Sequence, residues 1–288
     1  MFLKSNIFIS ILAGIVPALI TVGYKIFGPL IFFFSYFTPL PFFLISLKFN
    51  YLSLIISIFS SILFIIIFAS ANTAILFFII NALPALIISF EKLNKKHIYY
   101  GNIISKISIY KCLIYFIISF FYSKNIEEFS KAFHENLQAL TKNNLIINDN
   151  ILTLIPAVII ASWIIILVLN LIIAKNLLFK YEKSSQIKDK LIDIIIPNWF
   201  NILFLVLLIP ITVFNLNFPI LISAAIIISI PITIQGLTIL HFAAKKINYG
   251  NFFLYSLYGL IFFIPISLSI VTALGILDNF YNFRKLHK

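Results

Sequence analysis

The chain alternates long apolar segments with short polar ones, a pattern that predicts helices crossing a membrane. The longest uncharged segments are residues 49–90 and 194–244. The first holds 42 residues and would be about 63 Å long as one helix, twice the ~30 Å hydrocarbon thickness of a bilayer. Each segment is therefore expected to cross twice. The turns are expected near residues 70–73 and 215–219, where polar side chains gather.

The other apolar segments are each expected to cross once: residues 6–24, 26–47, 107–122 and 151–174. A cleaved signal peptide is the rival interpretation of the first, but no small-residue cleavage site follows it. Residues 107–122 are the weaker span, because they carry Lys111, which can extend its charge to the interface if it lies near an end. The last run, residues 247–277, would be about 46 Å long as one helix, so a break or hairpin at Pro265 is expected. We predict an all-α, polytopic integral membrane helical bundle of eight to ten transmembrane helices, forming a single domain over residues 1–288.

Residues 124–150 form the one sizeable polar segment between spans. Apolar side chains recur in it at helical spacing: Ile126, Phe129, Phe133, Leu137 and Leu140. This periodicity predicts an amphipathic helix over residues 126–140. A short extracytoplasmic helix lying on the membrane surface is preferred to a separate binding domain.

The composition supports a membrane environment. Hydrophobic residues make up 62% of the chain and charged residues 10%, whereas soluble domains carry about 25% charged residues. The net charge of +12 would suggest nucleic acid as the partner of a soluble protein. Here the lysines lie in short segments between apolar spans, so the lipid bilayer is the expected partner and nucleic acid is not.

The positive-inside rule predicts a cytoplasmic N-terminus in a bacterial cytoplasmic (inner) membrane. This orientation places most basic segments inside: Lys48, residues 91–106, residues 175–193, Lys245 and Lys246. The basic tail, residues 284–288, would lie outside after a single final span. A hairpin at Pro265 returns the tail inside, and this arrangement is favoured.

Catalytic and cofactor signals are absent from the sequence. The single cysteine, Cys112, allows no intramolecular disulfide, and no Cys/His spacing suits a metal. There is no glycine-rich phosphate loop, no carboxylate pair within a span and no histidine cluster. We therefore predict no cofactor and no metal, and the sequence disfavours an enzyme.

A few uncharged polar groups lie within or near the ends of the predicted spans: Asn81, Asn170, Trp199, Gln235 and His241. An amide in the bilayer needs a partner, because an unsatisfied polar group costs several kcal/mol in hydrocarbon. One interpretation is an interhelical hydrogen bond, typically worth about 0.6–2 kcal/mol. The other is a pocket that binds a neutral solute.

Asp278 and Arg284 are the last acidic residue and the only arginine in the chain. They are six residues apart, whereas contact on one helical face requires a spacing of three or four. In one interpretation Arg284 anchors phosphate headgroups, and Asp278 caps a helix or pairs with Lys285 or with another helix. In the other, the two residues lock the last span to a cytoplasmic loop or a partner subunit.

Five short motifs follow the order of the segments: Thr38-Pro39-Leu40-Pro41, Leu83-Pro84-Ala85, Pro197-Asn198-Trp199, Gln235-Gly236-Leu237 followed by His241, and Gly275-Ile276-Leu277-Asp278 with Phe283-Arg284. Together they resemble the YybS-like family of predicted multi-pass bacterial membrane proteins of unknown function. Asn282 stands where the resemblance leads us to expect an acidic residue. The resemblance implies a membrane bundle and brings no activity or cofactor.

Two functional hypotheses follow. The hydropathy profile is similar to that of the substrate-binding membrane subunits of vitamin transporters, an analogy of fold alone. It favours a transport-type protein, or the solute-binding subunit of a transporter with further membrane or cytoplasmic subunits as partners. The alternative is a non-catalytic membrane scaffold or envelope-organisation protein. The candidate binding residues are Asn81, Trp199, Gln235, His241, Asp278 and Arg284.

Overall fold

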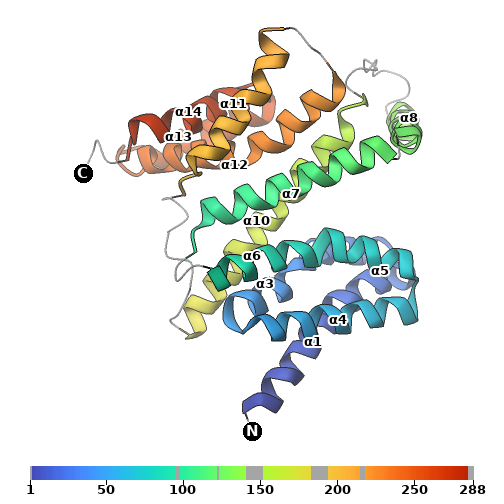
Figure 1. Cartoon of the computed structure of the whole chain (residues 1–288). Helices are drawn as coiled ribbons and strands as arrows, with labels where there is room; N and C mark the ends of the chain where they lie inside the picture. Colours follow the sequence, from blue (N-terminus) through green and yellow to red (C-terminus); the bar gives the residue numbers. More distant parts are fainter. Residues whose placement is uncertain are drawn as a thin grey trace. The chain divides into compact units, whose positions relative to one another are not determined.

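The computed structural model describes residues 2–94, 98–121, 123–140, 152–182, 194–214 and 218–284. The regular elements in these ranges are helices (Figure 1). The chain divides into two compact units. Unit 1 comprises residues 1–99 and 166–189, and unit 2 comprises residues 100–165 and 190–288.

Unit 1 is built mainly from the first third of the chain. Its helices are α1 (Phe2–Phe27), α2 (Pro29–Ser35), α3 (Pro39–Lys48), α4 (Tyr51–Phe68), α5 (Ala71–Phe77), the π-helical turn η1 (Phe78–Ala82), α6 (Leu83–Asn94) and the second half of α10 (Ile155–Glu182). The turn predicted near residues 70–73 is confirmed. Helix α4 ends there, and the Oγ of Ser70 caps α5 by accepting a hydrogen bond from the backbone N–H of Thr73.

Small residues and one lysine hold unit 1 together. A Cβ atom on Gly14 of α1 would lie 2.0 Å from the carbonyl oxygen of Ser57 in α4, so only glycine permits this approach. Lys92 of α6 donates hydrogen bonds to the carbonyl oxygens of Ser46 and Leu47, and also to that of Phe49. A cation at the C-terminus of a helix satisfies carbonyls that have no intrahelical partner. Lys92 therefore closes the end of α3.

Unit 2 contains the remaining helices, which include most of the predicted site residues. They are α7 (Tyr100–Phe121), α8 (Ser123–Leu140), the first half of α10, α11 (Asn198–Thr212), α12 (Pro219–Ala244), α13 (Gly250–Phe263) and α14 (Ser267–Tyr281). Helix α8 confirms the helix predicted over residues 126–140. The rest of that polar segment, residues 141–150, and the centre of the predicted turn, residues 215–217, lie outside the described residues.

Seven helical segments of the described chain are long and apolar enough to cross a membrane. They are residues 6–23, 31–48, 51–68, 71–94, 100–121, 155–181 and 219–244. Three further apolar helices, α11, α13 and α14, are only 14 or 15 residues long. At 1.5 Å per residue each spans about 21–23 Å, which is less than the ~30 Å hydrocarbon core.

Helices α12 and α14 pack against each other through two glycines (Figure 1). A Cβ atom on Gly236 would lie 1.9 Å from the carbonyl oxygen of Val271, and one on Gly275 would lie 2.2 Å from that of Ile232. Small residues allow the backbones of membrane helices to approach closely. Each helix therefore contributes one glycine, and the backbone of the other helix packs directly against it.

The two helices run in the same direction. Thr233 of α12 pairs with Thr272 of α14 through their hydroxyls, and Gln235, further along α12, bonds Asp278, further along α14. The chain must therefore reverse twice between them. The second reversal is the break predicted at Pro265, which separates α13 from α14.

Replacing Gly275 by alanine should destabilise unit 2 by about 1–3 kcal/mol, because the new Cβ would overlap the Ile232 carbonyl. The melting temperature in detergent measures this effect. Gly259→Ala in α13 is the matched control, since nothing lies within 4 Å of its added Cβ. Equal melting temperatures for the two variants would contradict the close contact.

The parallel arrangement predicts that the ends of α12 and α14 face the same side of the membrane. In a Cys112→Ala background, Tyr249→Cys and Tyr281→Cys place thiols at exposed positions just after α12 and at the end of α14. A membrane-impermeant maleimide should label both from one side of oriented vesicles. Labelling from opposite sides would show that α13 and α14 do not form a hairpin.

A buried polar cluster on α12 and α14

Gln235 is the centre of a buried polar cluster in unit 2. Its side chain is fully buried, and its amide makes three hydrogen bonds. The oxygen Oε1 accepts from the backbone N–H of Ile196 at 2.8 Å. The nitrogen Nε2 donates to Oδ2 of Asp278 at 3.0 Å and to Oδ1 of Asn279 at 2.8 Å. The amide therefore joins α12 to α14 and to the segment before α11.

Asp278 and Arg284 form a direct ion pair, with Nη2 and Oδ2 3.1 Å apart. Their spacing of six residues is too wide for contact on one helical face, so the contact was not predicted from the sequence. Helix α14 ends at Tyr281, and Asn282 adopts a left-handed conformation with φ of 47°. The chain turns back at Asn282, so Arg284 reaches Asp278 from beyond the end of the helix.

The residues Ile194–Ile196, which form a non-helical segment before α11, are held by this cluster. Arg284 donates from Nη2 to the carbonyl oxygen of Ile194 at 2.8 Å and to Oγ1 of Thr238 at 3.0 Å. Asn279 donates from Nδ2 to the carbonyl oxygen of Ile196 at 2.8 Å. Through Arg284 the pair is joined to the segment before α11, and its role in locking the last span to a cytoplasmic loop or a partner subunit stays a prediction. Lys285, the other suggested partner of Asp278, lies outside the described residues.

Helix α7 contacts the opposite side of the same segment. A Cβ atom on Gly101 would lie 1.9 Å from the carbonyl oxygen of Ile195. The segment is thus held between a glycine of α7 and the polar side chains of α12 and α14. Because its backbone groups belong to no helix, side chains must satisfy those that are buried.

Several buried polar atoms around the segment make no hydrogen bond within the described part of the chain. Asn201 of α11 is 2% exposed, and neither its Oδ1 nor its Nδ2 has a partner. The hydroxyl of Ser105 in α7 and the Oδ1 atom of Asp278 share this property. All three residues belong to helices that contact Ile194–Ile196 or follow it directly. This end of unit 2 is therefore polar and incompletely satisfied.

The structure does not place the remaining predicted residues in the cluster. Asn81 belongs to unit 1, within η1, where its Oδ1 accepts a hydrogen bond from Thr38 at 2.8 Å. Trp199 is 45% exposed and packs edge-to-face on Phe200. His241 shares a hydrogen bond of 2.7 Å with the hydroxyl of Tyr258 in α13. Of the six candidate binding residues, only Gln235, Asp278 and Arg284 lie together in the cluster.

The sequence analysis missed Thr238, Asn279 and Asn201. Asn279 and Asn201 did not stand out in the sequence, because asparagine is abundant in the chain. A positional signal was present, since Asn279 follows Asp278 and Asn201 lies one helical turn after the Pro197-Asn198-Trp199 motif. Among the described residues no group of three or more His, Cys, Asp or Glu side chains could hold a metal ion.

The helices and the buried cluster define a polytopic helical membrane protein. Residues 15–279 match a family model described as "Predicted membrane protein (DUF2232)", and the chain belongs to this family. Its function is unknown, and the match is consistent with the resemblance to the YybS-like predicted membrane proteins. No curated protein and no solved structure matches the chain.

Replacing Asp278 by asparagine should lower the stability of unit 2 by on the order of 3 kcal/mol, because it removes one partner of a buried ion pair. The amount of monodisperse protein in detergent and its melting temperature measure the loss. Glu128→Gln, an exposed acid of α8, is the control. Unchanged abundance and melting temperature for Asp278→Asn would refute the locking role.

Proposed function

We propose that this protein is a transport-type membrane protein that binds a small, neutral, polar solute at the polar end of unit 2. The observation that carries this proposal is the amide of Asn201, which is 2% exposed and has no hydrogen-bond partner in the described chain. An amide both donates and accepts hydrogen bonds, so a solute that offers hydroxyl or amide groups would satisfy both of its atoms. Leaving them unsatisfied in hydrocarbon costs several kcal/mol.

The short helices of unit 2 support the same function. Transporters commonly form their binding sites from discontinuous helices whose breaks line a cavity. Helices α11, α13 and α14 are each shorter than the hydrocarbon core, and the non-helical segment Ile194–Ile196 lies shortly before α11. Asn201 follows this segment by five residues.

We also propose the membrane topology that this function requires. The protein lies in a bacterial cytoplasmic membrane with its N-terminus inside, because that orientation places most lysines inside. Helix α11 adds an eighth crossing to the seven candidates, and α13 and α14 add two more if both traverse the bilayer. The amphipathic helix α8 then lies on the outer surface.

A solute that binds unit 2 should raise the melting temperature of the purified protein. Stabilisation follows RT ln(1 + [L]/Kd), or about 2.7 kcal/mol at a concentration of 100 Kd. A screen of sugars, polyols, amino acids and vitamins by thermal shift in detergent tests this. Asn201→Leu should abolish the shift, whereas Asn198→Leu, an exposed asparagine one turn earlier on α11, should retain it.

Two outcomes would contradict solute binding. One is the absence of solute-dependent stabilisation together with the absence of any co-purified small molecule. The other is a shift that both asparagine variants retain equally. Co-purification of a partner ATPase from native membranes would add support for a role as a transporter subunit.

The second candidate is a non-catalytic membrane scaffold. The three amides predicted to lie within spans all make hydrogen bonds that connect different parts of the chain. Asn170 donates to the carbonyl oxygen of Tyr36, and Asn81 accepts from Thr38. Gln235 joins α12 to α14 and to the segment before α11. Native-membrane purification that returns partner proteins but no solute would favour it.

A further inference from the structure

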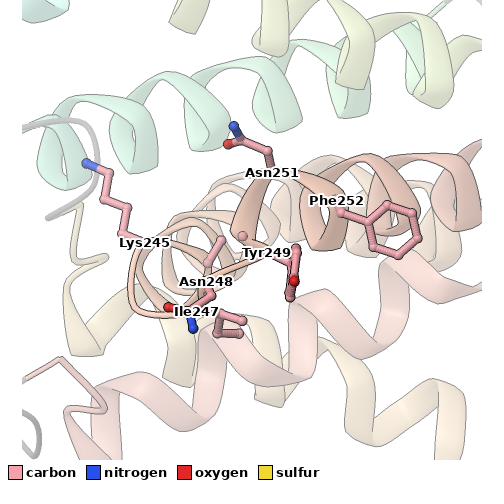
Figure 2. A pocket seen from close by; sticks show the side chains of 8 residues that line it. Lys245, Ile247, Asn248, Tyr249, Asn251 and Phe252 are labelled. Atoms are coloured by element: carbon pink, nitrogen blue, oxygen red, sulfur yellow. The ribbon is translucent and has the colours of Figure 1, made fainter.

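The turn between α12 and α13 carries a second polar site, separate from the buried cluster (Figure 2). A cavity of about 460 Å³ is lined by Ala244, Lys245, Ile247, Asn248, Tyr249, Gly250, Asn251 and Phe252. Its volume lies within the range of about 300–1,000 Å³ that is usual for small-ligand sites. The cavity begins where a candidate membrane span, residues 219–244, ends.

The polar side chains of this cavity supply hydrogen-bond donors at the protein surface. Lys245, Asn248 and Asn251 are exposed, and they make no side-chain hydrogen bond or ion pair within the described residues. An ammonium group offers three donors and each amide offers two more. None of the eight lining residues is acidic. Figure 2 shows the side chains of Lys245, Asn248 and Asn251 pointing in different directions from the turn, so they suit separate oxygen atoms of one large anionic group.

The apolar side chains beside these donors select among anions. Tyr249 and Phe252 are 80% and 73% exposed, and Ile247 is 50% exposed. Aromatic rings at the end of a membrane span are typical of the headgroup level of the bilayer. A soluble anion would gain nothing from these exposed apolar groups, whereas a lipid places glycerol and acyl carbons against them.

We propose that the turn from Lys245 to Phe252 binds the phosphodiester headgroup of an anionic phospholipid. Lys245 pairs with the phosphate, Asn248 and Asn251 donate hydrogen bonds to headgroup oxygens, and Tyr249 and Phe252 contact the glycerol and upper acyl region. Basic pockets at the ends of membrane helices are a recognised mode of headgroup binding.

The neighbouring lysine provides a matched control. Lys246 carries the same charge at nearly the same depth, but it does not line the cavity, and its Nζ lies over the ring of Phe242 at 4.6 Å from the centroid. Lys245→Gln and Lys246→Gln therefore remove equal charge. Only the first removes a cavity residue.

Native mass spectrometry of the whole protein in detergent, titrated with phosphatidylglycerol or phosphatidylcholine, tests the proposal. We expect wild type to prefer phosphatidylglycerol, Lys245→Gln to lose about fivefold in that affinity, and Lys246→Gln to retain it. The double variant Asn248→Ala/Asn251→Ala should also lose affinity although its charge is unchanged. A separate titration with inorganic phosphate and glycerol phosphate should show no comparable binding.

Three results would overturn the proposal: equal loss in both lysine variants, equal affinity for the two lipids, or binding of free phosphate as tight as that of phosphatidylglycerol. The first would indicate a diffuse electrostatic attraction, and the last a site for a soluble anion. Melting temperatures of the variants show whether they are folded. The lipid assay is independent of Asn201, so this proposal and the proposed solute site can fail separately.

Discussion

The hydrocarbon interior of a bilayer offers no hydrogen bonds, and this constraint governs the structure. A continuous helix satisfies its own backbone, but each break exposes N–H and C=O groups that the protein must then satisfy. In unit 2 the residues Ile194–Ile196, which precede α11, belong to no helix, and side chains bind their backbone groups. Gln235, Asn279 and Arg284 supply the bonds that a helix would otherwise provide to Ile194 and Ile196.

The binding of the segment Ile194–Ile196 depends on the close contact of α12 and α14. Gly236 and Gly275 allow the helices to approach, and the approach places Gln235 within reach of Asp278 and Asn279. Arg284 completes the arrangement because its guanidinium contacts a carboxylate, a carbonyl and a hydroxyl together.

The sequence predicted the membrane class, the amphipathic helix, the turn near residues 70–73 and the break at Pro265, because these depend on local hydropathy and on proline. It singled out Gln235, Asp278 and Arg284 because charge and amide groups are rare in such a chain. It could not show that they meet. That contact requires the left-handed Asn282 and the parallel packing of α12 and α14, in which Gln235 meets a residue 43 positions later in the chain, and neither leaves a periodic signal. Asn201 was missed because burial, and not residue type, distinguishes it from Asn198.

The pairing of Gln235 with Asp278 also has a consequence for biosynthesis. The two residues are 43 positions apart in the chain. At a synthesis rate of about 5–20 residues per second, α12 leaves the ribosome roughly 2–9 seconds before its partner. During that interval the N–H groups on Nε2 of Gln235 must be satisfied by water, by lipid carbonyls or by the insertion machinery, because their acceptors Asp278 and Asn279 are not yet made. The maturation of unit 2 is therefore a late event, which begins only when α14 reaches the membrane.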